Sequence, residues 1–269
     1  MKRVLLAIIV LSVAFVSCNN NPTSEPTENN EQTSFWDKPS QLKHNFLLEL
    51  KNNPENQDVI LINFLSDYKE IVNEAYDTLT DQGMHEYSPE LVNKLRENGF
   101  EAAESDESLY AGKPAKSSYV SENTTFIKKE TVDLLNPTSL KFLNMYCDEI
   151  ENLGSDDKTS IISGKLLVNS IFESGELLKE VKDSKYEKIT KEIYNMNLHI
   201  LFFGIEEYPA FDFMTDEFDR ETYNHMKEII IKYPNSNAAQ KFTVFVDLLT
   251  NSDLKKNKEI EDFLENLVL

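Results

Sequence analysis

Apolar residues recur every three or four positions along most of the chain after residue 53. The first long row keeps to one helical face for about five turns. It consists of Leu61, Phe64, Leu65, Tyr68, Val72, Ala75, Tyr76 and Leu79. Asn53 and Pro54 stand before it, in the order typical of a helix cap and a first helical turn. This pattern predicts a long amphipathic helix over residues 54–79.

Further periodic segments follow, and most are bounded by Pro, Gly or a capping residue. They predict helices over residues 88–98, 136–154, 157–181, 186–203, 217–233, 236–250 and 254–267. Apolar residues such as Leu166 and Leu167 cover most of the circumference of the helix predicted over 157–181, so we expect it to be the most buried helix. Its small residues Ser160, Gly164 and Gly175 are interpreted as packing notches, with ligand contact as the alternative.

Residues 99–125 interrupt the helical pattern. Apolar residues on both sides of the polar stretch 104–108 allow a small β-hairpin near residues 99–112, with that stretch at its tip. A serine-rich loop is expected to follow. Long loops are often functional or mobile, so this segment is either a partner-contacting feature or a mobile connector.

Glycine usage supports a helical fold. Only 7 glycines occur in 269 residues, whereas an average usage of about 7% would give about 19. Phosphate-binding glycine loops and tightly turned sheets are thereby disfavoured. The predicted fold class is all-α, an irregular multi-helix bundle of about eight or nine helices, together with the small hairpin near residues 99–112.

The N-terminal segment has the pattern of an export signal. Two basic residues precede an apolar run over residues 4–16, and the small Ser17 stands directly before Cys18. These residues resemble the signal peptide and lipobox of bacterial lipoproteins, which implies cleavage after Ser17 and lipidation of Cys18. An ordinary secretory signal or a single membrane anchor is the alternative, although the run is shorter than the roughly 20 residues of a spanning helix.

The segment after Cys18 is predicted to be a disordered tether. Residues 19–34 contain no aliphatic or aromatic side chain, so they cannot bury enough apolar surface to offset the entropy of ordering. The expected organisation is a signal peptide over residues 1–17, a lipidated cysteine and tether over 18–39, and an acidic helical domain over 40–269.

The charge of the chain restricts its partners. It has 27 basic and 47 acidic residues, a formal net charge of −20. Phosphate backbones and anionic lipids repel such a surface, so we expect no nucleic-acid partner. Membrane attachment is expected through lipid on Cys18 alone. The chain would then sit on the cell membrane or outer membrane, periplasmic or surface-exposed, and meet an unidentified protein or small molecule.

No local pattern identifies a catalytic residue, a metal site or a cofactor. The four histidines lie far apart, without the spacing of a zinc site: His44, His85, His199 and His225. His85 is expected in a solvated turn, and His199 as a hydrogen-bonded core residue. Cys147 shares an apolar helical row with Leu143, which predicts a buried core thiol rather than a reactive one.

Two polar features leave alternatives open. Ser155 and Lys158 match the Ser-x-x-Lys spacing, but they fall in a polar turn where helix capping is favoured. Seven carboxylates surround Arg220: Glu206, Glu207, Asp212, Asp216, Glu217, Asp219 and Glu221. Clustered carboxylates suit calcium, yet the EF-hand spacing is missing. A solvated acidic loop is therefore preferred, and calcium binding over residues 206–221 is left open.

One short segment has a second resemblance. Tyr233, Pro234 and Ser236, in the run 233–239, resemble the turn between repeats of tetratricopeptide-type lipoproteins, where an aromatic residue ends one helix and serine caps the next. The sequence as a whole predicts a lipid-anchored envelope lipoprotein with an all-helical binding or structural domain of unknown ligand. The alternatives are a hydrolase or metal-dependent enzyme with a site assembled across helices, and a tetratricopeptide-like scaffold of an envelope complex.

Overall fold

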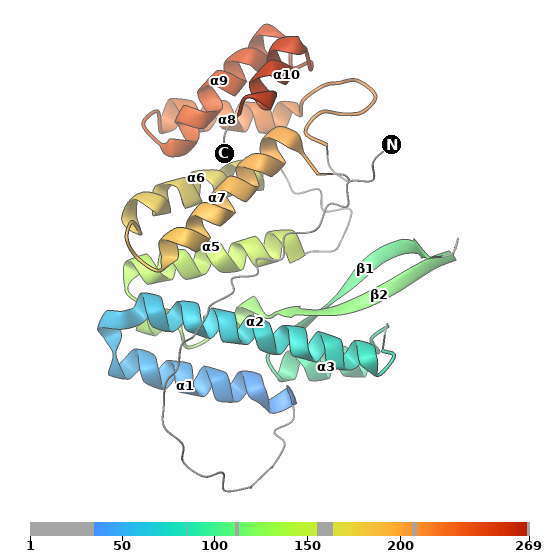
Figure 1. Cartoon of the computed structure of the whole chain (residues 1–269), viewed down its shortest axis with the longest axis vertical. Coiled ribbons are helices and arrows are strands. Elements are labelled where there is room, and N and C mark those ends of the chain that lie inside the picture. Colours follow the sequence, from blue (N-terminus) through green and yellow to red (C-terminus); the bar gives the residue numbers. More distant parts are fainter. Residues whose placement is uncertain (1–34, 85, 111–112, 155–163, 206–208, 268–269) are drawn as a thin grey trace, which may run out of the picture. The chain divides into compact units, whose positions relative to one another are not determined.

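Ten α-helices and one two-stranded antiparallel sheet form the part of the chain that this computed structural model describes, residues 35–84, 86–110, 113–154, 164–205 and 209–267 (Figure 1). The helices are α1 Lys38–Asn52, α2 Gln57–Asp81, α3 Pro89–Glu97, α4 Thr124–Lys128, α5 Pro137–Gly154, α6 Gly164–Glu180, α7 Tyr186–Phe203, α8 Arg220–Lys232, α9 Asn237–Asn251 and α10 Lys258–Glu265. The strands are β1 Phe100–Tyr110 and β2 Lys113–Glu122. The predicted all-α class is confirmed.

Capping residues set several helix starts where the sequence predicts them. The hydroxyl of Ser88 accepts from the backbone N–H of Leu91 at the start of α3, at 3.3 Å. Ser236 does the same for Ala239 at the start of α9, at 3.0 Å. Each bond satisfies an N–H that the first helical turn leaves unpaired.

The folded part begins earlier than the sequence suggests. Residues 35–39, assigned above to the tether, form the 3-10 helix η1 Phe35–Asp37 and the start of α1. Trp36 packs edge-on against Phe100, with ring centroids 6.4 Å apart. Helix α1 was not predicted, because its core-facing row includes Lys43, and a lysine at that place hides the apolar period.

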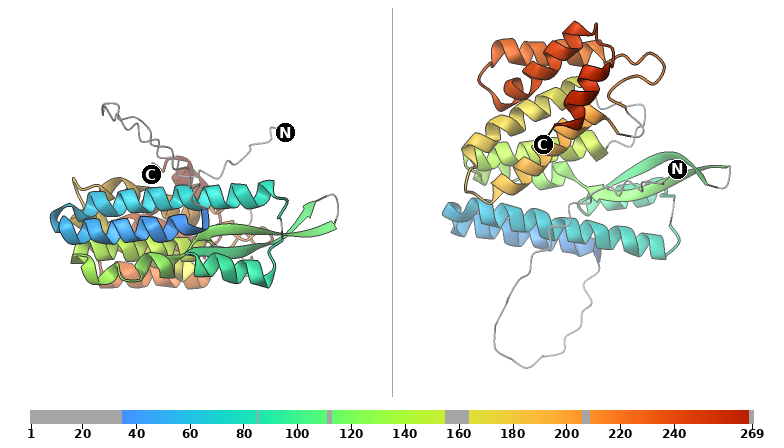
Figure 2. Two further views of the ribbon diagram at one scale, coloured as in Figure 1. Left: turned by 90° about the horizontal axis from the view of Figure 1, so that it is seen from below. Right: turned by 45° about the horizontal axis from the view of Figure 1, so that its top comes forward.

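The hairpin is longer than predicted, and its tip lies elsewhere. The pairing runs from Phe100 opposite Glu122 to Tyr110 opposite Lys113, so the polar stretch 104–108 belongs to β1 rather than to a tip. The serine-rich segment expected to be a loop lies in β2. Its polarity suggested a loop, but cross-strand pairing satisfies the backbone groups just as well. The hairpin projects beyond the helices that lie around its base (Figure 2).

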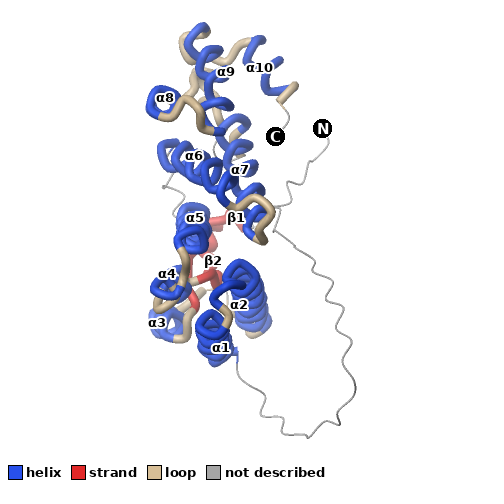
Figure 3. The backbone as a smooth tube through the Cα atoms, turned by 90° about the vertical axis from the view of Figure 1, so that its left-hand side faces the viewer, coloured by secondary structure: helices blue, strands red, loops and turns tan. Residues whose placement is uncertain are grey.

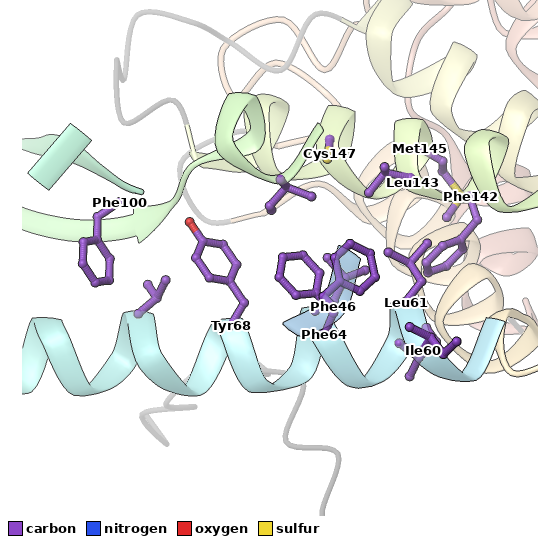
Figure 4. Packing of buried hydrophobic residues seen from close by; sticks show 14 of the residues in the cluster. Phe46, Ile60, Leu61, Phe64, Tyr68, Phe100, Phe142, Leu143, Met145 and Cys147 are labelled. Atoms are coloured by element: carbon purple, nitrogen blue, oxygen red, sulfur yellow. The ribbon is translucent and has the colours of Figure 1, made fainter. Parts of the chain in front are cut away.

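The first hydrophobic cluster, which we call the N-terminal core, joins helices α1 to α5, the base of the hairpin, and parts of α6 and α7. Leu61, Phe64 and Tyr68 point from α2 toward the side chains of α5 (Figure 4). Cys147 on α5 is fully buried here, and burial raises the pKa of its thiol to about 12. The predicted core position of Cys147 is confirmed.

The second cluster, the C-terminal core, lies among α6 to α10. Phe245 on α9 is fully buried and meets Phe202 and Phe218 edge-on, with centroids 4.9 and 5.4 Å away. A Cβ on Gly175 would come within 3.0 Å of the Tyr194 ring, which confirms that this glycine is a packing notch.

Helix α6 is less buried than predicted. Leu166 is 47% exposed, so this residue does not belong to the core. The helix has one face in the C-terminal core and another along α5, and a third face is open to solvent. Residues 157–163 of the predicted helix, including Ser160, lie outside the described residues.

Candidate functional site

A groove runs between α5 and α6, where the two cores meet. Its two hollows share Met145, Asp148 and Glu173, and have volumes of about 200 and about 320 Å³. Lys141 lies opposite Glu180 at one end, with Nζ and Oε1 2.5 Å apart, and Glu149 farther along α5 bonds with Ser170 nearer the start of α6, so the two helices are antiparallel. The lining residues recur every three or four positions on each helix, so each wall is one helix face.

Carboxylates dominate the walls of this groove. One basic residue, Lys141, and five acidic residues line the groove. The acids are Asp148, Glu151, Glu173, Glu176 and Glu180. Lys128 of α4 approaches the far end, with Nζ 3.3 Å from Asp148 and 3.8 Å from Glu151. In the described part of the chain, Glu173 has no basic partner within ion-pair distance. The middle of the groove is therefore its least compensated section.

The floor of the groove is apolar. Met145 and Leu177 are buried at its base, whereas Phe172 is half-buried and Leu166 is largely accessible. Phe172 is held in place by Tyr233, whose ring stacks on it with centroids 4.4 Å apart. A ligand in this groove would meet hydrocarbon below and negative charge on both sides.

A buried polar network fixes the spacing of the helices around the groove. Ser170 of α6 donates to Glu149 of α5 at 3.0 Å, and Asn197 of α7 donates to Glu149 at 3.1 Å and to Ser170 at 2.9 Å. Glu149 and Asn197 are only 7% and 2% exposed. Helix α7 lies on one side of α5 and α6 (Figure 3), and this network ties it to both.

Two carboxyl groups at the groove have raised pKa values. Burial raises the pKa of Glu149, although its hydrogen bonds with Asn197 and Ser170 oppose this shift. Partial burial also raises the pKa of Glu173, and the nearby charge of Asp148 adds to the effect. Burial is the largest cause of both shifts, and the charge of Asp148 raises both pKa values further.

The predicted histidines do not converge on the groove. His199 was predicted to be a core residue, but it is exposed and stacks on Phe203, with centroids 4.8 Å apart. His44 is also exposed. His225 is within 2.9 Å of Asn169, one of the lining residues of the groove, and 3.1 Å from Glu228. The sequence expectation for His199 was wrong because its helix turns this residue toward solvent.

The acidic stretch 206–221 is built into turns and caps where the structure describes it. Asp212 accepts from the N–H groups of Met214 and Thr215, both at 2.9 Å, and these bonds lower the pKa of its carboxyl. Asp219 caps α8 by accepting from the Thr222 N–H at 2.7 Å. Among the described residues, no three His, Cys, Asp or Glu side chains are grouped to hold a metal ion.

The turn that follows Asp212 displays two large apolar side chains. Phe213 and Met214 are 78% and 92% exposed, whereas Phe211 and Phe218 on either side are buried in the C-terminal core. Hydrogen bonds between Asp212 and Glu217 and between Asp212 and Asp216, both 2.9 Å, hold the turn. These exposed residues give the molecule a second distinctive surface, which the sequence analysis did not single out.

Several sequence-predicted site residues lie outside the described residues: Cys18, His85, Ser155, Lys158, Glu206 and Glu207. The groove itself was also missed, because its residues come from two helices and from no single motif. The one available signal was the row of acids at helical spacing on α6, at positions 173, 176 and 180.

Comparison with known protein families, characterised proteins and solved structures finds no match for this chain. The lipoprotein and tetratricopeptide resemblances therefore rest on the quoted residues alone. Within the described ranges, no helix is both long enough and apolar enough to span a bilayer.

Proposed function

We propose that this protein is a lipid-anchored lipoprotein of the bacterial envelope whose helical domain binds a cationic ligand in the α5–α6 groove. The observation that carries the binding proposal is the groove itself, in which five carboxylates border an apolar floor. Lys128, Lys141 and Lys179 pair with four of these acids, and Glu173 has no basic partner among the described residues. A ligand of opposite charge associates with the groove faster and is oriented by its field, and the apolar floor adds contact area.

The envelope location is supported by the N-terminal sequence. The apolar run over residues 4–16 and the small residue before Cys18 suit signal cleavage and lipidation of that thiol. Two or more acyl chains anchor a protein stably, so no apolar surface of the domain is needed for attachment. The acidic charge then keeps the domain from adsorbing to anionic lipid.

Binding is tested with the mature chain, purified from membranes in a nonionic detergent. Calorimetric titration with spermidine and with a lysine-rich peptide should detect binding of at least one of them. The double variant Asp148→Asn, Glu173→Gln should weaken it by about tenfold or more. The control is Glu259→Gln, Asp262→Asn on α10, which makes the same charge change on exposed residues outside the groove. Equal weakening by both pairs, or no binding at all, would refute the groove as the site.

Lipidation is tested by mass spectrometry of the chain isolated from cells. We expect a mature N-terminus at Cys18 that carries acyl groups, and Cys18→Ser should abolish this modification. Cys147→Ala is the control, because the Cys147 thiol is buried and its loss should leave the N-terminal modification unchanged. An unmodified sulfur at residue 18 in the native chain would overturn the anchor.

One observation favours a second candidate function, a hydrolase. General acid catalysis requires a carboxyl whose pKa is raised, and burial together with the nearby Asp148 raises the pKa of Glu173. Hydrolysis of chromogenic glycosides that Glu173→Gln abolishes, while the E259Q/D262N control keeps it, would support this role. If the native chain hydrolyses none of the glycosides tested, the hydrolase role is refuted.

A further inference from the structure

We infer that the occupant of the α5–α6 groove is an amphipathic helix with basic flanks, supplied by a partner protein. The inference rests on the proposed function and names the class of ligand. It depends on the shape of the groove, on the distribution of apolar and charged residues in it, and on the helix that already covers its other side.

The shape of the groove suits a helix. On α5 the lining runs from Lys141 to Glu151, and on α6 from Leu166 to Glu180. At about 1.5 Å per residue these stretches are about 15 and about 21 Å long, which corresponds to three or four helical turns. The seam between two antiparallel helices is a surface into which the side chains of a third helix pack.

Hydrogen bonds and packing hold the two helices together. On the side away from the groove, α7 packs along α6 and reaches α5, and Asn197 is bonded to both through Ser170 and Glu149. Among the described residues, the opposite side of the seam is the open groove formed by the two hollows. A preformed seam binds at a lower entropic cost than one that must be assembled.

The chemistry of the lining specifies the occupant. The accessible parts of Leu166 and Phe172 require an apolar stripe on the ligand, and acids on both walls, such as Asp148 and Glu173, require bases on both sides of that stripe. A helix with apolar residues every three or four positions and Lys or Arg on its flanks has this arrangement. A linear polyamine carries the charge but has no side chains to cover Leu166.

Alternative macromolecular occupants are disfavoured by charge. A second copy of this chain would bring another 47 acidic residues against 27 basic ones, and nucleic acid or an anionic bilayer would bring phosphate. The complementary partner is a basic segment, and the lining stretches match the length of one such helix.

The test compares three ligands on the mature chain in nonionic detergent. The first is an amphipathic peptide of about 18 Lys and Leu residues, long enough to form a helix on binding. The second is a scrambled peptide of the same composition that cannot segregate its leucines on one face, and the third is spermidine. We expect the amphipathic peptide to bind about tenfold or more tightly than either control ligand, and to gain helical circular dichroism when bound.

A matched pair of variants separates the apolar from the charged contribution. Leu166→Gln should weaken the amphipathic peptide about fivefold and leave spermidine unchanged. Leu48→Gln is the control, because Leu48 on α1 is 46% exposed, almost the same as the 47% of Leu166, and lies outside the groove. The modest burial of both leucines means that neither change should unfold the domain.

The outcomes distinguish this inference from the proposed function. If spermidine or the scrambled peptide binds as tightly as the amphipathic one, and the acidic-groove variant D148N/E173Q weakens it, the helical occupant is refuted while the cationic site stands. If no ligand binds, both are refuted. If Leu48→Gln weakens the peptide as much as Leu166→Gln does, the peptide binds elsewhere and the inference fails.

Discussion

The N-terminal and C-terminal cores differ in the polar contacts that stabilise them. In the N-terminal core, polar side chains bond to backbone groups far away in the sequence: Lys43 donates to the carbonyl of Ile127 and Gln57 to that of Leu134. The C-terminal core also has a bond between distant residues, from the Asn237 amide to the carbonyl of Gly175. Its helices α8, α9 and α10 all start with a side-chain cap three positions away, as Asp219 does for Thr222. Local capping is visible in a sequence, whereas a bond across some eighty residues is not.

The aromatic packing differs as well. Phe245 stands at the centre of an edge-to-face group in the C-terminal core, in which Phe202 and Phe218 contact it directly. The N-terminal core stacks Phe46 on Phe64 with centroids 4.1 Å apart, beside the buried ammonium of Lys43. The N-terminal core thus places a desolvated charge beside its stacked rings, whereas the rings around Phe245 pack on one another.

The largest expected effect is on packing in the C-terminal core. Phe245→Ala should lower the free energy of unfolding by about 3–5 kcal/mol, because Phe245 is fully buried and its loss leaves a cavity. Chemical denaturation measures this change. The control is the same substitution at Phe213, which is 78% exposed and should change stability by less than about 0.5 kcal/mol. Similar losses for both would show that Phe245 is not central to this core.

The second effect concerns the buried lysine of the N-terminal core. Lys43→Met should cost about 1–3 kcal/mol, because the carbonyls of Phe126 and Ile127 and the hydroxyl of Thr131 lose their donor. Lys38→Met on the same helix is the control, since it breaks only a solvent-accessible ion pair with Glu74.

The Lys43 effect should also grow with pH. Burial lowers the pKa of Lys43 to about 8, whereas an unfolded lysine keeps its proton to about pH 10.4. Between these values the unfolded chain binds more protons, so the wild type gains stability as pH rises and the methionine variant does not. Denaturation at pH 7 and pH 9.5 should show the larger difference at pH 9.5. A smaller difference there would contradict the burial of the charge.

The third expected loss of stability is at the boundary between the two cores. Glu149→Ala should cost about 1–2 kcal/mol, because Ser170 and Asn197 lose their acceptor. Glu149→Gln keeps an acceptor and removes a buried charge, so it should equal or exceed the wild type in stability at pH 7.5. Its advantage should shrink as pH falls through the raised pKa of Glu149, because the wild type then becomes neutral too. An advantage that grows toward acid pH would be inconsistent with this assignment.

The smallest expected loss of stability comes from removing a helix cap, and it should be the same in the N-terminal and C-terminal regions. Ser88→Ala and Ser236→Ala each remove a side-chain cap, and each should cost about 1 kcal/mol. Thermal denaturation of the two variants measures it, with serine-to-threonine variants at both positions as controls that keep a hydroxyl. A loss above about 2 kcal/mol at only one position would mean that this serine does more than cap its helix.

The sequence predicted the C-terminal half better than the N-terminal half. Helices α7, α8 and α9 were predicted to within a few residues, because Gly204 ends α7 and the turn from Tyr233 to Ser236 separates α8 from α9. Helix α1 was missed because of Lys43. The hairpin was predicted with the wrong tip because its strands are polar, and polarity does not distinguish a solvated strand from a loop.

The candidate site could not be predicted from the sequence. Asp148 and Glu173 are two among 47 acids, and only the antiparallel packing of α5 on α6 brings them to one groove. Leu166 was predicted to be buried, but α6 turns it to the open side of that groove. Which acids face each other depends on the register between helices, and local periodicity does not specify it.

The sequence by itself determined the helical class, the places where most helices begin and end, the acidic charge and the core position of Cys147, because period, caps and composition are local properties. Only the tertiary structure decided where α1 and the hairpin lie, which polar side chains are buried, and that an acidic groove with an apolar floor opens between α5 and α6. These features depend on contacts between residues far apart in the chain, which form only when the helices pack together.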